Sequence, residues 1–260
     1  ANCQFATTLA DVTFGNNTYV AVGDNGEILR STDNGSSFSI LDYNRYWNGI
    51  TFGNGTFVGV GDLGKIKRSV DNANTWYDST SGLPASSSYN LNGVTFGNNT
   101  FVSVAQSGKI VRSTNNGSNW NNANSGLPAS SSYNLNGVTF GNNTFVAVGL
   151  SGKIVRSTDN GTSWDNATNS SSTLNGVAFG NNTFVAVGQS GKIVRSTDNG
   201  SNWNNVNSGL SASSSNNLKE VTFGNNTFVA VGLSGKIVRS TDNGSSWDNA
   251  TSGLPASSSY

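Results

Sequence analysis

One unit of sequence is repeated six times along the chain, and this repeat limits what the chain can fold into. The clearest copy is residues 138–164, VTFGNNTFVAVGLSGKIVRSTDNGTSW, which returns at residues 221–247 with Ser245 in place of Thr162. More altered copies begin at Val12, Ile50, Val94 and Val177. Repeats of this length are typical of folds in which each copy is one structural unit that buries its apolar surface against its neighbours.

Each copy predicts four short strands. In the clearest copy we expect strands at residues 135–140, 144–149 and 153–158 and a fourth from near residue 164, with turns at GNN, LSG and DNG between them. Both faces of the second strand are apolar, so the sheet must be covered on both sides. We therefore predict an all-β fold, a six-bladed β-propeller of four-stranded antiparallel blades. A linear solenoid is the alternative, but it would carry polar capping units, and the terminal copies show no such change.

The repeat also predicts the domain organisation. We expect a single propeller domain over residues 1–260, with a leading segment at residues 1–8 and repeats that start near residues 9, 47, 91, 135, 174 and 218. The copies differ in length only after the Trp, where a loop of the type SGLPASSSYN is present at residues 81–90 and 125–134, with a variant at 208–217. Such variation is typical of surface loops on a rigid scaffold.

Composition excludes several classes of function. The 14 basic residues balance the 14 acidic ones, which gives no electrostatic footprint for nucleic acid. The chain has no His and a single Cys3, which excludes a Ser-His-Asp triad and a His-ligated zinc. No apolar run approaches the roughly 20 residues that would span a bilayer, so we expect no membrane insertion. We also expect no cofactor and no metal.

Localisation is predicted less directly. The chain lacks Met, so Ala1 is not a translation start, and we expect a processed, excised or engineered chain. Asn-x-Ser/Thr sequons recur at the turns, where glycans on every blade would crowd the surface. We therefore favour an exported or cell-surface protein of bacterial type.

The loop at residues 157–164, STDNGTSW, has the pattern S-x-D-x-G-x-x-W and resembles the Asp-box, or bacterial neuraminidase repeat. The residues before it, V-x-F…F-V-A-V-G…G-K-I-V-R-S-T-D, resemble more closely the repeats of photosystem II assembly-factor-like propellers. The resemblance covers about residues 9–250. Those propellers have seven blades as a rule, so six is a departure. Phe38, Ala73 and Asn115 depart from the loop pattern, and we expect the loops that contain them to be looser.

We interpret this loop as structural, with the Asp and Ser side chains bonding to local backbone N–H groups and the Trp packing into the blade. The alternative is that its carboxylates bind cations or act in catalysis. The residues concerned are Asp33, Asp71, Asn115, Asp159, Asp198 and Asp242, with Trp76, Trp120, Trp164, Trp203 and Trp247.

A resemblance to sialidases would imply an arginine cluster, a Tyr nucleophile and a Glu partner. The recurring arginines all occupy one equivalent strand position, which favours a place between blades over a substrate cluster; they are Arg30, Arg68, Arg112, Arg156, Arg195 and Arg239. Only Glu27 and Glu220 are available as Glu, so we predict that the protein is not an enzyme. The assembly-factor resemblance would instead imply a scaffold that contacts a polypeptide through an arginine-rich patch.

The end of the blades opposite the Asp-type loops carries the variable loops and is the predicted binding face. The candidate ligand-binding residues are Tyr89, Tyr133 and Tyr260, with Lys109, Lys153, Lys192 and Lys236. Aromatic rings among small hydroxyl residues suit a sugar or a peptide, although the tyrosines could equally serve as covers for the loops.

The sequence therefore predicts a monomeric, non-enzymatic scaffold or binding module that presents several equivalent sites to a glycan or polypeptide partner. An Asp-box glycan hydrolase and a recently amplified or engineered array without a specific ligand are the alternatives.

Overall fold

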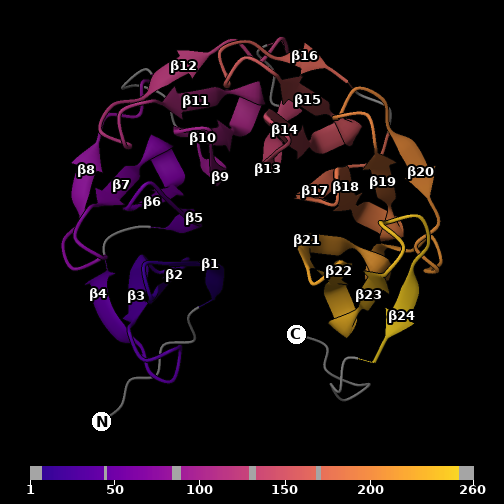
Figure 1. The fold of residues 1–260 in the computed structure, drawn as a ribbon, viewed down its shortest axis with the longest axis horizontal. Coiled ribbons are helices and arrows are strands. Elements are labelled where there is room, and N and C mark those ends of the chain that lie inside the picture. The colour runs from indigo at the N-terminus through magenta and orange to yellow at the C-terminus, as the bar shows by residue number, and fades with distance from the viewer. Residues whose placement is uncertain (1–7, 44–45, 84–88, 129–132, 168–170, 252–260) are drawn as a thin grey trace. The chain divides into compact units, whose positions relative to one another are not determined.

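Six sheets, each of four antiparallel strands, make up the chain, which confirms the predicted six-bladed β-propeller. The computed structural model describes residues 8–43, 46–83, 89–128, 133–167 and 171–251. In every sheet the strands lie in sequence order, so each blade is a continuous meander (Figure 1). No α-helix is present in the described ranges, where the only helical elements are short 3-10 turns.

The blades are numbered in chain order. Blade 1 consists of β1 Leu9–Gly15, β2 Thr18–Gly23, β3 Glu27–Ser31 and β4 Ser39–Tyr43. Blade 2 consists of β5 Trp47–Gly53, β6 Thr56–Gly61, β7 Ile66–Ser69 and β8 Tyr77–Ser79. Blade 3 consists of β9 Leu91–Gly97, β10 Thr100–Ala105, β11 Ile110–Ser113 and β12 Asn121–Ala123.

The last three blades repeat the pattern. Blade 4 consists of β13 Leu135–Gly141, β14 Thr144–Gly149, β15 Ile154–Ser157 and β16 Asp165–Asn166. Blade 5 consists of β17 Leu174–Gly180, β18 Thr183–Gly188, β19 Ile193–Ser196 and β20 Asn204–Val206. Blade 6 consists of β21 Leu218–Gly224, β22 Thr227–Gly232, β23 Ile237–Ser240 and β24 Asp248–Ala250.

The turns follow from residues that tolerate positive φ. Between β13 and β14 the chain reverses at Asn142 and Asn143, whose φ angles are 47° and 61°. Asn adopts this conformation more readily than most residues because its short polar side chain bonds locally. Between β14 and β15 the 3-10 turn η4, Leu150–Gly152, contains Ser151 at φ 53°. The backbone N–H of Lys153 closes this turn on the carbonyl of Leu150, so β15 starts one residue later than predicted.

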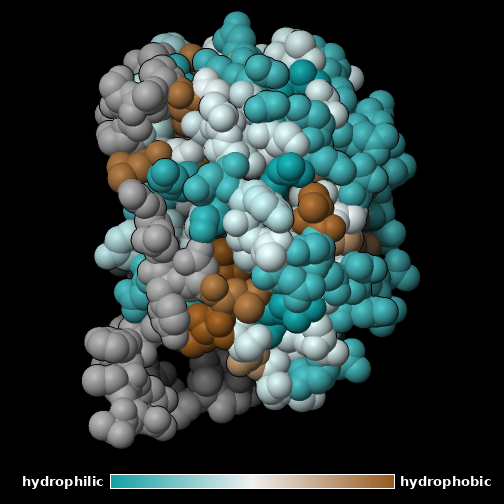
Figure 2. Space-filling view, turned by 90° about the vertical axis from the view of Figure 1, so that its left-hand side faces the viewer, coloured by the Kyte–Doolittle hydropathy of each residue, from teal (hydrophilic) through white to brown (hydrophobic). Residues whose placement is uncertain are grey.

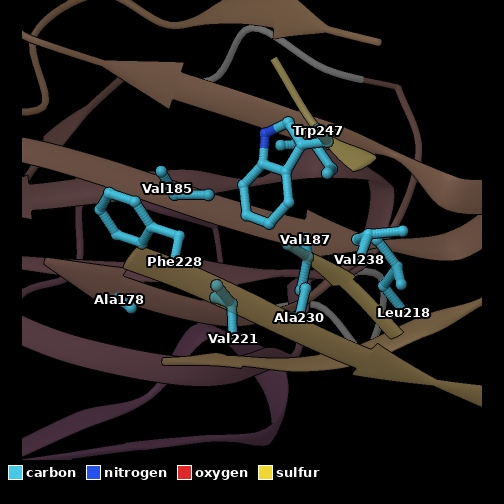
Figure 3. Close-up of a cluster of buried hydrophobic side chains, with 10 residues drawn as sticks. Ala178, Val185, Val187, Leu218, Val221, Phe228, Ala230, Val238 and Trp247 are labelled. Atoms are coloured by element: carbon cyan, nitrogen blue, oxygen red, sulfur yellow. The ribbon is translucent and has the colours of Figure 1, made fainter. Parts of the chain in front are cut away.

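The chain divides into two compact units, Ala1–Ala123 with blades 1–3 and Asn124–Tyr260 with blades 4–6. Within each unit the apolar core lies between consecutive blades. In the second unit, Val146 and Ile154 of blade 4 pack against a cluster from blade 5 that includes Phe184 and Trp203. Figure 3 shows the next core, in which Phe228 and Trp247 of blade 6 lie beside valines of blade 5.

Each blade thus has two apolar faces, named here by the neighbour they cover. The forward face faces the next blade and in blade 4 carries Val146, Val148 and Ile154. The backward face faces the preceding blade and in blade 5 carries Leu174, Phe184 and Trp203 among others. The cores of blades 1–2 and of blades 2–3 are built from the equivalent residues. The expectation that both faces of the second strand are covered is confirmed in β14, where all six residues are buried.

A Phe–Gly contact recurs at the end of the first strand in both units. The ring of Phe179 lies on the backbone of Gly141, so that a Cβ added to this glycine would overlap the ring. The same arrangement pairs Phe52 with Gly15, Phe96 with Gly53 and Phe223 with Gly180. Glycine is required at these positions because the next blade approaches its backbone closely.

Polar side chains cover most of the surface that Figure 2 shows. Figure 2 shows a predominantly hydrophilic surface on the side that is at the left in Figure 1, interrupted by a few apolar patches. No helix in the described part of the chain is long and apolar enough to span a membrane.

Replacement of Gly180 by Ala tests the Phe–Gly contact. The added methyl group would overlap the ring of Phe223, so we expect a loss of about 1–3 kcal/mol in the free energy of unfolding. Gly59 is the matched control, because an added Cβ there would meet its nearest atom at 3.6 Å, an ordinary contact, and the equivalent residue of blade 4 is Ala147. Gly59→Ala should not lower the free energy of unfolding. Both variants are unfolded in urea at low protein concentration. Equal losses in the free energy of unfolding would contradict the conclusion that the Phe223 ring requires a glycine at position 180.

Candidate functional site

The loop between the third and fourth strands, named here the box loop, is residues 157–164 in blade 4. Ser157 Oγ donates to Asp159 Oδ1 at 2.7 Å and accepts from the backbone N–H of Gly161 at 2.9 Å. The other oxygen, Asp159 Oδ2, accepts from Ser163 Oγ at 2.6 Å, and the indole N–H of Trp164 donates to the carbonyl of Gly161 at 3.2 Å. The carboxylate is therefore engaged by its own loop.

The hydrogen bond from the Ser hydroxyl to the Asp carboxylate recurs in the box loops of blades 1, 2, 5 and 6, at Asp33, Asp71, Asp198 and Asp242. The side chain of Ser246 lowers the pKa of Asp242 to about 2, and that of Thr75 lowers the pKa of Asp71 to about 2. Although burial raises the pKa of Asp159, hydrogen bonds from Ser163 and Ser157 outweigh it and bring the value to about 2. These carboxylates stay ionised because the ionised form accepts bonds from its loop.

Three box loops depart from this pattern. Phe38 replaces Trp in blade 1 and is exposed. In blade 2 Ala73 occupies the left-handed position of the glycine at φ 62°, and the buried indole N–H of Trp76 has no hydrogen-bond partner in the described chain. In blade 3 Asn115 offers one oxygen, which accepts from Ser113 Oγ and from the backbone of Asn119.

The repeated arginine links three of the box loops to the preceding blade. Arg30 Nε donates to the carbonyl of Asn72 in the box loop of blade 2 at 2.8 Å, and Arg195 Nε donates to that of Asn243 in blade 6 at 2.7 Å. Arg156 makes the equivalent bond to Asn199 at 3.3 Å. These three arginines lie between blades, as their position favoured, and they do not form the exposed patch that the assembly-factor resemblance implied.

At the opposite end of the blades the structure brings predicted ligand-binding residues together. Lys109 Nζ lies 5.8 Å from the centre of the Tyr89 ring in blade 3, and Lys153 Nζ lies 5.0 Å from that of Tyr133 in blade 4. Both distances are in the range of a cation–π interaction. All four side chains are partly exposed, so each Tyr–Lys pair can be reached from solvent.

The remaining predicted residues do not form such a pair. Ser172 stands before blade 5 where a tyrosine would be needed for Lys192. Asn216 takes the equivalent place before Lys236 and is buried, with its amide bonded to the carbonyl of Ser211 at 2.8 Å. Tyr260 lies outside the described residues.

An asparagine that the sequence interpretation missed anchors the loops before blades 3 and 6 to a turn of the preceding blade. Asn90 Oδ1 accepts from the backbone N–H of Leu63, in the 3-10 turn η1 Asp62–Gly64 of blade 2, at 3.2 Å. Asn217 does the same for Ser190 at 2.8 Å. Leu83 fixes the start of the first loop by packing against the core of blades 2 and 3. The signal was available, because an Asn closes each SGLPASSSYN-type loop.

The carboxylates of the described residues are not clustered for metal binding. No group of three or more His, Cys, Asp or Glu side chains in the described ranges could hold a metal ion. Of the two Glu residues, Glu27 is buried in blade 1 and Glu220 accepts from the backbone N–H of Val221 in blade 6.

Comparison with known proteins supports the architecture. A family profile described as the DUF6242 beta propeller domain matches residues 72–218, more than half of the chain. A search of curated proteins found no match.

Three solved structures share the fold. "YCF48 bound to D1 peptide" matches with a TM-score of 0.72 and 18% identity over 95% of this chain and 81% of that one. YCF48 from Cyanidioschyzon merolae matches with a TM-score of 0.73 and 19% identity over 95% and 86%. The computationally designed Ika8 protein matches with a TM-score of 0.61 and 14% identity over 90% and 84%. At these identities the likeness shows the fold, and at that level it agrees with the resemblance to photosystem II assembly-factor propellers.

Trp164 and Asp159 should contribute unequally to stability. Trp164→Ala removes a buried ring and should cost about 3–5 kcal/mol in the free energy of unfolding. Asp159→Ala removes hydrogen bonds at an exposed loop and should cost about 1 kcal/mol. Denaturant unfolding of both variants checks this, and equal costs would show that the carboxylate does more than hold its loop.

The box loops should make the protein sensitive to acid. A carboxylate whose folded pKa lies below its unfolded value of 3.8 contributes stability that is present above that value and is lost as the pH falls towards about 2. Asn115→Asp should add this dependence to blade 3, because Asn119 can donate to the second oxygen as Asn202 does to Asp198. The urea midpoint of the variant should therefore fall more steeply than that of the wild type between pH 4 and pH 2. Midpoints that fall equally steeply in both proteins would contradict a stabilising role for the ionised box-loop carboxylates.

Proposed function

This chain belongs to the family of the DUF6242 beta propeller domain, and from that premise we propose that it is a non-enzymatic scaffold that binds an extended polypeptide through its Tyr–Lys pairs. The observation that carries the proposal is the stacking of Lys109 on Tyr89 and of Lys153 on Tyr133, at equivalent positions of two blades. The box loops, for which the Asp-box is the closest sequence pattern, serve to hold the scaffold.

A Tyr–Lys pair suits the groups that a polypeptide presents. The ammonium group can bond to a backbone carbonyl or a side-chain carboxylate, and the phenol ring offers an apolar edge and a hydroxyl group. A sugar would need a face of the ring for stacking, and Lys109 and Lys153 lie over one face of each ring. A polypeptide is therefore favoured over a glycan. The YCF48 structure with a bound D1 peptide supports this choice as a polypeptide complex of a protein with the same fold.

We propose that the protein is not an enzyme, and the reason is the chemistry of its carboxylates. Hydrolysis of a glycosidic bond needs two carboxyl groups that converge on it. The box-loop carboxylates accept hydrogen bonds from their own loops, as Asp159 does from Ser157 and Ser163. The chain also has no His that could act as a general base.

Loss of the tyrosines should remove binding in steps. We expect a peptide selected on an array to bind the wild type at two weak sites, with one site lost in Tyr89→Ala, one in Tyr133→Ala and both in the double variant. Titration calorimetry gives the number of sites. Tyr77→Ala is the matched control, since this exposed tyrosine lies in β8 and not in a loop that precedes a first strand.

Two results would contradict the proposal. Binding that survives in the double variant would show that the tyrosines only cover their loops. Glycan binding with the same dependence on Tyr89 and Tyr133, in the absence of peptide binding, would favour the glycan alternative.

A further inference from the structure

One turn at the end of the blades that carries the Tyr–Lys pairs differs from its equivalents. The 3-10 turn η1, Asp62–Gly64, connects β6 to β7 and has Leu63 at its centre. The other blades have a polar residue at this position: Asn25, Ser107, Ser151, Ser190 and Ser234. A bulky apolar side chain therefore replaces a small polar one in blade 2 alone.

The backbone conformation at Leu63 does not favour a bulky residue. Its φ is 56°, in the left-handed region that glycine and asparagine adopt most readily. The four serines at the equivalent position have φ angles of 53–55°, so the later turns share this conformation. The local conformation of the turn therefore does not explain why this residue is Leu.

Burial does not explain Leu63 either, because its side chain is 52% exposed. Beside the turn lies Tyr46, whose carbonyl accepts from the backbone N–H of Asp62 at 3.1 Å and whose side chain is 56% exposed. The residues that make the equivalent backbone bond in the later blades are Asn90, Asn134, Thr173 and Asn217. Blade 2 thus has an exposed leucine and an exposed tyrosine where the later blades have polar residues.

The other side of the same turn lies against the loop that carries Tyr89. A Cβ added to Gly64 would lie 3.8 Å from the carbonyl oxygen of Tyr89, and the backbone N–H of Leu63 donates to Asn90 Oδ1 at 3.2 Å. The turn is therefore flanked by Tyr46 on one side and by the Tyr89 loop on the other. All of these residues belong to the first compact unit.

The second unit has the same contact between turn and loop without an apolar residue. There the backbone N–H of Ser190 donates to Asn217 Oδ1 at 2.8 Å, and a Cβ added to Gly191 would lie 3.0 Å from Ser208 Oγ of the loop. The contact therefore forms equally well with Ser at the centre of the turn. Leu63 adds an exposed apolar side chain that this structural role does not require.

Together these side chains offer two kinds of contact to a ligand. Lys109, which lies over the ring of Tyr89, offers an ammonium group that favours a carboxylate. Leu63 and Tyr46 offer apolar surface that favours an aliphatic or aromatic side chain. An extended polypeptide advances about 3.3 Å per residue, so residues close together in its sequence can present both groups to one site.

We propose that Leu63 and Tyr46 form an apolar subsite beside the Tyr89–Lys109 pair, and that the combined site takes a polypeptide segment in which an aliphatic or aromatic residue lies close to an acidic one. This inference rests on the proposed function and adds the chemical class of the partner. The later blades have Ser at the position of Leu63, so the chain has one such subsite. The site of blade 3 should therefore bind such a segment more tightly than the site of blade 4.

The two sites can be measured one at a time, since Tyr133→Ala leaves the site of blade 3 and Tyr89→Ala leaves that of blade 4. The probe comes from an array of Gly–Ser peptides that carry one Glu and one Leu at different separations. Its control is the same peptide with Ser in place of Leu. Titration calorimetry gives the affinity of each peptide at each site.

Leu63→Ser should weaken binding of the probe at the site of blade 3 by about five- to tenfold, because it removes apolar surface that the probe covers. It should not change binding of the control peptide, or of the probe at the site of blade 4. The variant should keep the wild-type melting temperature, since Ser adopts the same φ in four other blades. Val70→Thr is the matched control, because Val70 is 51% exposed in the box loop and the other blades have Thr there.

Three results would overturn the inference. A probe that requires Tyr89 but binds Leu63→Ser as tightly as the wild type would overturn it and leave the proposed function intact. Failure of every peptide to bind, or binding that is indifferent to both Tyr89 and Tyr133, would overturn the proposed function and this inference with it. A mass in light scattering that rises with concentration in the wild type but not in Leu63→Ser would assign Leu63 to a contact between copies of the chain.

Discussion

Contact between one blade and the next is the interaction on which the rest of this structure depends. A four-stranded sheet with apolar residues on both faces cannot bury either face by itself. Each described core is therefore shared by two blades, as in the cluster that joins Val185 of blade 5 to Phe228 of blade 6. The Phe–Gly contact sets how closely the blades approach, because the ring of Phe223 can reach the backbone at Gly180 only where no Cβ intervenes. Stability and geometry are thus properties of pairs of blades.

The box loop contributes to both local and long-range order. Its Ser and Asp side chains bond to the loop itself, while the Asn that follows the Asp reaches the preceding blade. Asn243 Nδ2 donates to Thr183 Oγ1 at 2.7 Å, and its carbonyl accepts from Arg195. Apolar packing is not directional, whereas these hydrogen bonds fix the register of one blade against the next. Because these groups bond to the scaffold, this end of the blades has few polar groups left for a ligand.

The repeat period and the apolar alternation were enough to predict the strands, since both act within a few residues along the chain. The second strand, Thr144–Gly149, has the bounds expected for it, and the first strand, Leu135–Gly141, extends one residue further. The partner of the repeated Arg was harder to predict, because Asn72 lies 42 residues after Arg30 and the bond exists only once two blades are packed. For the candidate site, the sequence predicted the end of the blades and the residue types, but not which side chains contact each other. The stacking of Lys109 on Tyr89 occurs in a loop that Asn90 anchors to a turn of the preceding blade, which residue type alone does not show.

Because the repeat is nearly uniform, specificity for a partner must come from the few positions that vary. The residues that form the junctions must stay the same in every blade, because each has to fit the next one. The loop before each first strand has no such constraint, and there Tyr133 becomes Ser172 before blade 5 and Asn216 before blade 6. Asn216 is buried and its amide donates to the carbonyl of Ser211, so this blade lacks the aromatic ring and its Asn216 side chain is not available at the surface. One substitution therefore removes a proposed site while the blade keeps its four strands. The number of proposed binding sites can thus change independently of the number of blades, and by this route a chain of repeated units can acquire a face that distinguishes one partner from another.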